Sequence, residues 1–431
     1  MSYCEERSVS KTEPRARHVA QRSAAIAGTG LRHGGRALLR CIARPTGQAS
    51  TDGTRGLAEF VADLGPAFVK SAQLLSTRRD LLAPRWCDAL GQLHDQVRPM
   101  SRRQAATALH HAYAGRATWP FRRFDTTAVA SGSIACVYRA ELRDGTKAAV
   151  KLRRPGLHTM IDVDLSLLAA GAGVVQRLPA MRRVPVMRMI EQVSATIRRQ
   201  LDLDLESQSL QALRQNLDGF PRLLVPRHFP DECGDGALVM EFVPGLRRFG
   251  PESFTREQRR ELVRQILHGV YRMIFVDGLV HCDMHPGNLY LNPDGRIVLL
   301  DAGFVVELPV HVKRLFAEFF LNMSLGRGPE CAEVVLRSAE LVPPDADLDA
   351  FRAGIVDLVK KTAGRRAGDF RLAPFATRLF ELQRRSGVAA APEFVFPLLS
   401  MLVLEGMIND FDVDVDFQAE AIPTLLPALN R

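Results

Sequence analysis

At 431 residues, with 46% hydrophobic and 24% charged side chains, the chain can bury sizeable cores and has a globular composition, which excludes disordered and fibrous classes. The formal net charge of +9 is concentrated at one end: residues 1–56 hold ten Lys or Arg against four Asp or Glu, which leaves 47 against 44, or +3, for the rest. Seven Cys form no CxxC pair, which argues against a zinc site or a disulfide framework and fits a reduced cytosolic protein.

Residues 1–56 are expected to form a basic, partly disordered tail. Within it, residues 31–44 have a weak basic amphipathic pattern that is interrupted by Gly34 and Gly35. A helix on an anionic membrane surface therefore stays open as the alternative, with the tail as the point of peripheral contact. No nucleic acid partner is expected.

No segment has the pattern of a leader or of a membrane span. Residues 1–22 lack the apolar core of a signal peptide. The longest apolar stretches, residues 165–175 and 394–404, fall short of the ~18 residues that a spanning helix requires. We therefore expect a cytoplasmic protein without a transmembrane helix, peripheral at the inner face of the membrane at most.

Residues 57–120 are expected to form a helical extension. Apolar residues recur there at helical spacing, with a break at Gly65-Pro66. Lys70 and Gln73 lie three residues apart and therefore project from one face of a helix. By itself, such a pair indicates a solvated face.

From Phe121 the period changes to that of strands. The pattern predicts a strand, a turn at Asp144-Gly145 and a second strand that ends at Lys151. Small residues lie where a nucleotide-binding hairpin needs close approach of its backbone to phosphates, and they are Ala130, Ser131, Gly132 and Ser133. Lys151 would then contact the phosphates, and a plain surface lysine is the alternative.

Residues 184–216 have the pattern of one long amphipathic helix. Its apolar stripe consists of Ile190, Val193, Ile197, Leu201 and Leu205. Asp202 and Glu206, four residues apart, share one face of that helix. Either carboxylate is a candidate to fix Lys151 by an ion pair.

Residues 225–245 predict two short strands and then a hinge between two lobes. The backbone from Glu241 to Val243 is placed to contact the edge of an adenine ring. Thr255 and Gln258 form the capping box of the next helix, which runs toward residue 276. The apolar residues expected to pack beneath the following segment are Leu262, Ile266, Val270 and Ile274.

The segment HCDMHPGNLYLNPDGRIVLLDAGF, residues 281–304, carries the chemistry. In protein kinases, HRDxxxxN, a hairpin and DFG supply a base on the first Asp and metal ligands on the Asn and the second Asp. Here Asp283 takes the position of the base, and Asn288 and Asp301 take those of the magnesium ligands. Residues 289–291 and 297–300 predict the strands of the hairpin, with its turn at 292–295.

A transition-metal site is one alternative for this segment, since His281, Asp283 and His285 alternate and would share one face of a strand. That interpretation leaves Asn288 and the triplet at Asp301 unexplained. The other alternative is a polar loop without chemistry. It would bury carboxylate and amide groups unpaired, at a cost of about 1–3 kcal/mol each.

After residue 304 the chain is expected to return to helix at about residue 312. No APE-like element follows, although protein kinases need such a segment to dock a peptide substrate. Residues 398–407 predict an apolar helix in the core of the C-terminal lobe.

Taken together, these motifs resemble those of the UbiB/AarF family of atypical kinase-like ATPases over about residues 57–410. The family motif KxGQ is matched by Lys70-Ser71-Ala72-Gln73, and the segment STRxDLLP by residues 76–82. The Ala-rich loop of the family is matched by residues 130–135, and its ExD motif by Gln200-Leu201-Asp202. Glu206 matches the Glu that pairs with the strand lysine, HxDxHPGN is matched at residues 281–288, and DFG at 301–303.

The chain departs from the family pattern at three positions. The Gly of KxGQ is Ala72, the Glu of ExD is Gln200, and the third Ala of the loop is Gly132. The resemblance implies that the KxGQ helix folds over the nucleotide cleft, contacts the ExD residues and blocks peptide substrates. Because Gln200 removes a charge from that contact, the tightness of the cover stays open.

We therefore expect an α+β, bilobal protein-kinase-like fold, with a small β-rich N-lobe, a helical C-lobe and a helical extension over the cleft. The expected divisions are a tail at residues 1–56, the extension at 57–120, an N-lobe with a long helical insert at 121–245, and the C-lobe at 246–431.

The resemblance implies an ATPase with ATP and Mg²⁺ as cofactors, which hydrolyses ATP or phosphorylates a small lipid-like molecule of isoprenoid-quinone metabolism. Lys151, fixed by Glu206, would hold the α and β phosphates, and Asp283 would be the base. The further nucleotide contacts would be residues 130–133, Glu241 and Val243, with Lys70 and Gln73 as a cap and Asn288 and Asp301 on magnesium. A protein kinase and a nucleotide-sensing scaffold without turnover are the alternatives.

Overall fold

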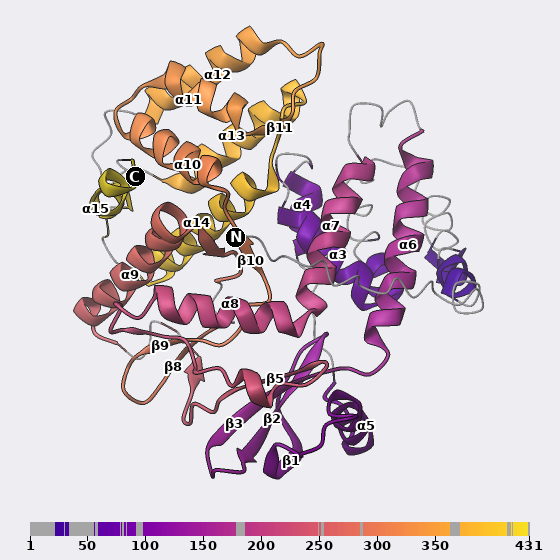
Figure 1. Ribbon diagram of the computed structural model, residues 1–431. Coiled ribbons are helices and arrows are strands. Elements are labelled where there is room, and N and C mark those ends of the chain that lie inside the picture. The colour runs from indigo at the N-terminus through magenta and orange to yellow at the C-terminus, as the bar shows by residue number, and fades with distance from the viewer. Residues whose placement is uncertain are drawn as a thin grey trace, which may run out of the picture.

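The computed structural model describes residues 22–29, 31–33, 56, 59–77, 79, 82, 84–91, 98–177, 186–248, 250, 254–284, 288–362, 371–411, 415 and 417–429. Most of the expected tail, residues 1–56, and His285 of the transition-metal alternative lie outside them. A small sheet with one helix beside it forms the bottom of the molecule in Figure 1, and a large helical lobe forms its upper left. A third group of helices lies at the right of the same view.

The small lobe is built on an antiparallel sheet with the strand order β1-β2-β3-β5. Its strands are β1 (Phe121–Ser131), β2 (Ala135–Leu142), β3 (Lys147–Arg153) and β5 (Ala237–Glu241). Helix α5 (Arg102–Ala112) packs on it and begins at a capping box formed by Ser101 and Gln104. The expected turn at Asp144-Gly145 is present, with Gly145 at φ 87°.

Two details of the expected hairpin are wrong. Residues 121–131 form a strand of their own, so Ala130 and Ser131 end β1 and residues 132–134 separate it from β2. Strand β3 continues to Arg153, so Lys151 is flanked by paired residues on both sides. The reason is that Leu152 is apolar and joins the core between the sheet and α5, which extends the pairing by two residues.

The third group of helices contains residues 59–64 and four longer elements. These are α3 (Pro66–Thr77), α4 (Pro84–Gly91), α6 (Leu157–Val175) and α7 (Val186–Leu201). Helix α3 begins after Gly65, whose φ of 105° ends the preceding helix. Buried side chains of α3, α6 and α7 form one apolar cluster, against which Ile134 and Phe304 also pack.

In the described part of the chain, α6 alone has the length and apolar composition of a membrane-crossing helix. The apolar run counted in the sequence, residues 165–175, is shorter because the helix already begins at Leu157. Length and composition alone are weak evidence for a span, because core helices share both properties. The first half of α6 carries the buried residues Ile161 and Leu165 of the cluster with α3.

The prediction of one helix over residues 184–216 is wrong at its centre. The chain forms α7 and then α8 (Leu203–Asn216), with Asp202 between them at ψ 98°. The Asp202 side chain accepts hydrogen bonds from the backbone N–H of Asp204 and Leu205, at 3.0 and 3.1 Å, and is therefore the N-cap of α8. Leu205 is consequently off the apolar stripe and 38% exposed.

The large lobe surrounds a second sheet with the strand order β4-β9-β8-β6. Its strands are β4 (Leu223–Leu224), β6 (Arg247–Arg248), β8 (Leu289–Leu291) and β9 (Ile297–Leu299), and the separate pair is β7 (Leu279–His281) with β10 (Val305–Glu307). The expected hairpin is confirmed as β8 and β9. Its turn is closed by a hydrogen bond from the Gly295 N–H to the Asn292 carbonyl.

Helix α9 (Arg256–Tyr271) confirms the predicted capping box of Thr255 and Gln258 and continues as a π-helical turn, Arg272–Asp277. The remaining elements are a 3-10 turn (Pro230–Glu232), α10 (Val310–Ser324), α11 (Gly328–Arg337), β11 (Ala339–Leu341), α12 (Leu348–Thr362), α13 (Leu372–Ser386), β12 (Ala389–Ala390), α14 (Pro392–Asp410) and α15 (Phe417–Leu429).

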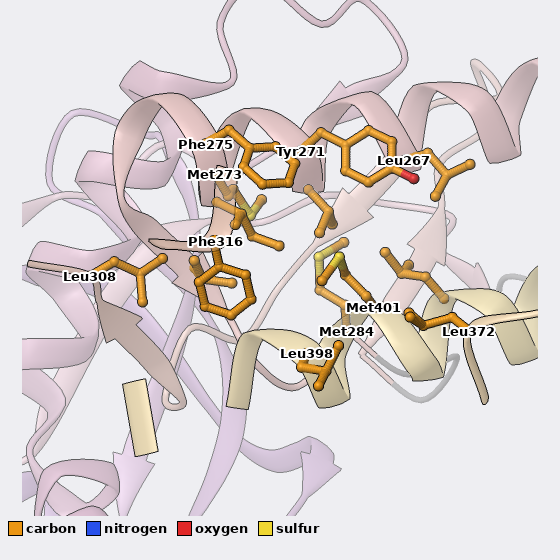
Figure 2. Close-up of a cluster of buried hydrophobic side chains, with 14 of the residues drawn as sticks. Leu267, Tyr271, Met273, Phe275, Met284, Leu308, Phe316, Leu372, Leu398 and Met401 are labelled. Carbon is orange, nitrogen blue, oxygen red and sulfur yellow. The ribbon is translucent and has the colours of Figure 1, made fainter. Parts of the chain in front are cut away.

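One apolar core fills the large lobe (Figure 2). The four expected residues of α9 and its extension, Leu262, Ile266, Val270 and Ile274, are all buried in it together with the apolar side of β8 and β9. Leu398 and Met401 of α14 point into the same cluster, so the prediction of a core helix over residues 398–407 is confirmed. The hairpin of residues 281–304 therefore rests on a rigid apolar base.

The cap of α8 leads to a prediction on stability. Asp202→Ala removes the acceptor of two backbone N–H groups and should lower the free energy of unfolding by about 1 kcal/mol, whereas Asp202→Asn should retain most of it. Urea unfolding followed by circular dichroism measures both values. Gln211→Ala, an exposed change on the same helix, is the control, and equal stabilities of Asp202→Ala and the control would contradict the capping role.

Candidate active site

Three charged side chains from distant parts of the chain meet between the two lobes. The ammonium of Lys151, on β3, lies 2.6 Å from Oε1 of Glu206 and 2.9 Å from Oδ2 of Asp301. Glu206 is in the first turn of α8, and Asp301 follows β9. The Glu206 side chain is 1% exposed, that of Lys151 15% and that of Asp301 41%. Glu206 is thus the carboxylate that fixes Lys151, and Asp202 is used as a helix cap.

These three groups, the Lys151 triad, carry one positive and two negative charges. Burial by itself raises the pKa of Asp301, but the neighbouring Lys151 ammonium and the N–H of Gly303 outweigh burial and hold that pKa well below its usual range. For Glu206, burial and the charge of Asp301 together outweigh the attraction of Lys151 and raise its pKa to about 6. Burial lowers the pKa of Lys151, but Asp301 and Glu206 raise it further, so the ammonium stays charged. The triad therefore has a net charge of −1 at neutral pH and attracts a cation.

Asp283 and Asn288 lie beside the triad at the start of the hairpin. Nδ2 of Asn288 donates to the backbone carbonyl of Asp283 at 2.9 Å and to its Oδ2 at 3.0 Å. Because both donations use the nitrogen, the amide oxygen of Asn288 is the atom left to hold a metal. The two predicted residues are therefore brought together, and each orients the other.

His281 holds this segment against Asp301. The backbone N–H of Asp283 donates to Nδ1 of His281 at 3.1 Å, so Nε2 carries the ring proton and donates to the carbonyl of Asp301 at 2.5 Å. On the other side, Oγ of Ser400 on α14 donates to the carbonyl of His281 at 3.0 Å. The buried ring thus joins the segment before β8 to the segment after β9.

The transition-metal alternative loses its basis in this geometry. Strand β7 ends at His281, so Asp283 is not at an alternating strand position, and both ring nitrogens of His281 are already hydrogen-bonded. Within the ranges that the structure describes, no group of three or more His, Cys, Asp or Glu is arranged to hold a metal ion. Asp301 and Asn288 offer oxygen atoms, which suit magnesium with its water and phosphate ligands.

The small residues before the triad form a tight loop between β1 and β2. The Gly132 N–H donates to the carbonyl of Ala135 at 2.9 Å and closes the turn. A Cβ on Gly132 would meet that carbonyl oxygen at 3.6 Å, an ordinary contact, so the backbone does not require glycine here. Ala130 and Gly132 are exposed, while Ser131 and Ser133 are half-buried.

The loop and the segment after Asp301 lie against the helices that include α3, because Ile134 and Phe304 pack on the apolar cluster of α3, α6 and α7. Lys70 and Gln73 are half-buried on α3. Lys70 makes no hydrogen bond or ion pair with any described residue, so the structure does not bring it into contact with the triad. Gln200 is buried, and in the described part of the chain its Oε1 accepts no hydrogen bond.

The hinge residues 241–243 differ in which of their backbone and side-chain groups already have a hydrogen-bond partner. The Glu241 N–H donates to the carbonyl of Arg227 at 2.7 Å, and its carboxylate accepts from the Arg227 N–H at 3.0 Å, so the side chain faces away from the cleft. The Phe242 N–H donates to the carbonyl of Lys147 at 3.2 Å. No described residue accepts from the Val243 N–H. Of the hinge, the Glu241 carbonyl and the Val243 N–H are therefore the groups that can hold a base.

Two residues of the site were not predicted from the sequence. Ser400 lies more than a hundred residues from His281, and a serine in an apolar helix gives no sign of its partner. Arg154, which bonds the loop between β1 and β2, follows β3 in a run of Lys and Arg that looks like an exposed strand end. Their roles depend on tertiary contacts, and only the structure reveals them.

The residues of this site lie in a part of the chain that matches a known protein family. Residues 92–334 match the ABC1 atypical kinase-like domain, a range that includes the triad, Asp283 and Asn288. Two proteins described as "Probable protein kinase UbiB", from Vibrio atlanticus (strain LGP32) and Aliivibrio fischeri (strain ATCC 700601 / ES114), are each 30% identical over 371 residues, which is 84% of this chain and 68% of theirs. The protein of the same description from Azotobacter vinelandii (strain DJ / ATCC BAA-1303) is 30% identical over 371 residues, 84% of this chain and 69% of its own.

A solved structure gives the same fold. The complex of Rv3197 with erythromycin from Mycobacterium tuberculosis has a TM-score of 0.57 to this chain, covers 95% of it and is covered completely. At 18% identity the likeness concerns the fold alone. The expected α+β kinase-like fold is thereby confirmed.

The raised pKa of Glu206 predicts a pH dependence of stability. Protonation of a group whose pKa is higher in the folded chain favours folding, so this contribution is complete below the ordinary pKa of 4.5 and is lost as the pH rises through about 6. The free energy of unfolding should therefore gain about 1 kcal/mol from this group as the pH falls from 7.5 to 5, at 1.36 kcal/mol per pKa unit. Asp301 stays ionised throughout that range.

Urea unfolding at both pH values tests this, with Glu206→Gln as the variant that lacks the titrating group. Lowering the pH from 7.5 to 5 should raise the free energy of unfolding more in the unmodified chain than in Glu206→Gln. Glu307→Gln, a change of an exposed carboxylate on β10, should leave the difference unaltered. Identical pH dependence in all three proteins would contradict the assignment.

Proposed function

This chain belongs to the UbiB/AarF family of ABC1 atypical kinase-like proteins, and from that premise we propose that it holds Mg-ATP between its lobes as an ATPase or small-molecule phosphotransferase. The observation that carries the proposal is the convergence of Lys151, Glu206 and Asp301 from three separate elements. The group of one ammonium and two carboxylates has a net negative charge, which a divalent cation compensates. The same ammonium can bind phosphate oxygens.

Lys151 and Asp301 would exchange partners when the nucleotide binds. In the structure Oδ2 of Asp301 is taken by Lys151 and Oδ1 by the Gly303 N–H. Lys151 would release Oδ2 and turn to the α and β phosphates, while Glu206, which has no other cation, keeps it in the cleft. Asp301 and the amide oxygen of Asn288 would then hold Mg²⁺, which neutralises charge on the phosphates.

Asp283 is the residue that would act on the attacking group. His281 accepts a hydrogen bond from its backbone N–H and Asn288 donates one to its carboxylate, so both residues position Asp283, whose carboxylate would orient a water or a hydroxyl group. Such a carboxylate positions the nucleophile or takes its proton. The Glu241 carbonyl and the Val243 N–H would bind the adenine edge, and the loop of residues 130–133 would approach the phosphates. Lys70 and Gln73 on α3 would cap the site.

For the acceptor we propose water or a small lipid-like molecule, in support of isoprenoid-quinone or related lipid metabolism. The chain passes from β10, which ends at Glu307, into α10 at Val310, and no long segment for docking a peptide lies between them. This observation favours a small acceptor over a protein. Peripheral membrane contact through the basic residues 1–56 belongs to the same proposal.

A purified-protein assay of ADP release from Mg-ATP, with and without anionic liposomes and a quinone-precursor analogue, tests this function. Asp301→Asn should lower turnover by about 100-fold or more, because the site loses both a metal ligand and half of its negative charge. Asp357→Asn, an exposed carboxylate of α12 that pairs with Lys361, is the matched control and should keep full turnover.

The same assay separates the alternatives. Phosphate that appears on added protein would replace the proposal by a protein kinase. Binding of Mg-ATP without ADP release under every condition would replace it by a nucleotide-sensing scaffold. Turnover that persists in Asp301→Asn would contradict the proposed metal site.

Lys151→Ala gives a separate test of nucleotide binding. Without the ammonium, the two carboxylates of the triad face the phosphates unscreened, and the affinity for Mg-ATP should fall by about tenfold or more. Isothermal titration measures it, and Lys361→Ala, an exposed lysine of α12, is the control. Unchanged affinity in Lys151→Ala would remove Lys151 from the site.

A further inference from the structure

The loop between β1 and β2 has few backbone hydrogen bonds of its own. Ser131, Gly132 and Ser133 are small, Gly132 is exposed, and Ile134 packs against the apolar cluster of α3, α6 and α7. One backbone hydrogen bond, from the Gly132 N–H to the Ala135 carbonyl, closes the turn. A loop that contacts phosphates through its backbone must nevertheless keep its N–H groups in fixed directions.

Arg154 supplies the missing attachment. Its Nε donates to the carbonyl of Gly132 at 3.0 Å, and its Nη2 donates to Oγ of Ser131 at 2.9 Å. The Arg154 N–H also donates to the carbonyl of Ile134 at 2.9 Å. One residue thus holds three positions of the loop, with the backbone on one side and the planar guanidinium on the other.

The same guanidinium connects the loop to the segment before α5. Nη2 of Arg154 also donates to the backbone carbonyl of Arg98 at 2.8 Å. Oγ of Ser131 also accepts from Sγ of Cys136 at 3.6 Å, so the serine that bonds the guanidinium is also joined to the buried core of the small lobe. Arg154 follows Lys151 by three residues and lies directly after β3, the strand that carries this lysine.

We infer that Arg154 is a positioning residue that fixes the loop of residues 131–134 in the conformation that accepts the phosphates of a nucleotide. The inference rests on the proposed function, since it concerns the same site. Arg154 acts through the loop and does not touch the reacting atoms. Its loss should therefore weaken binding of a nucleotide with phosphates and leave the adenine contacts at the hinge unaltered.

Arg154→Lys is the informative variant, because it keeps the charge and the backbone hydrogen bond but loses the planar fork. Its affinity for Mg-ATP should fall by about tenfold, which is the loss of one charge-assisted contact, while its affinity for adenosine should not change. In the absence of any ligand, amide hydrogen exchange of residues 131–136 should become about tenfold faster.

Arg153→Lys is the matched control. Arg153 is the neighbouring residue of the same charge, and its guanidinium donates to the Leu201 carbonyl and to Asp235, away from the loop. Its affinities for Mg-ATP and adenosine should both stay within about twofold of those of the unmodified chain.

Isothermal titration of the full chain with Mg-ATP and with adenosine decides the matter. A loss confined to Mg-ATP in Arg154→Lys supports the inference. Equal affinity for Mg-ATP in Arg154→Lys and the unmodified chain, or an equal loss for both ligands, overturns it and leaves the proposed function intact. An unmodified chain that binds no Mg-ATP overturns the proposed function, and the inference with it.

Discussion

The whole site depends on one ammonium shared between two carboxylates. Lys151 lies within 3 Å of Glu206 and Asp301, which come from two separate elements, α8 and the segment after β9. Removing Lys151 would leave two neighbouring carboxylates without their cation, which is costly in a medium of low polarity. Because Glu206 is almost completely buried and Asp301 is partly open to solvent, the two carboxylates are not equivalent. The first anchors the lysine, and the second is free to change partners.

Most of the fold serves to bring those three groups together. Strand β3 presents Lys151 from inside a sheet, and the cap at Asp202 starts α8 one turn before Glu206. Asp301 follows a hairpin whose apolar side is buried against α9 and α14. His281 and Ser400 add polar contacts that connect this hairpin to α14. Rigid elements therefore supply each member of the triad, and short segments between them supply the freedom for chemistry.

The sequence allowed the local features to be predicted. The hairpin of β8 and β9, the capping box at Thr255 and the apolar face of α9 each follow from residues within a few positions of one another, where spacing is informative. The choice between Asp202 and Glu206 could not be made in this way, because a continuous helix pattern hides a cap in its middle. The strand β1 was missed because its exposed polar positions obscure the alternation.

The contacts of Ser400 and Arg154 lay beyond prediction for a different reason. Each depends on which surfaces meet after the lobes have folded, and neither residue type announces its partner. The net charge of the triad could not be predicted either, because the order of the motifs identifies the residues but not their protonation states. Its pKa values follow from burial and from distances, which only the three-dimensional arrangement supplies.

Helix α3 has a consequence for kinetics. Together with α6 and α7 it forms an apolar cluster that packs against Ile134 of the small lobe and Phe304 of the large lobe, so the two lobes are joined by a water-excluding seam. Exchange of any molecule held between them requires that seam to separate first. Contacts of this kind weaken on cooling and in urea, so the residence time of a bound molecule is set by solvent and temperature as well as by the polar groups that recognise it.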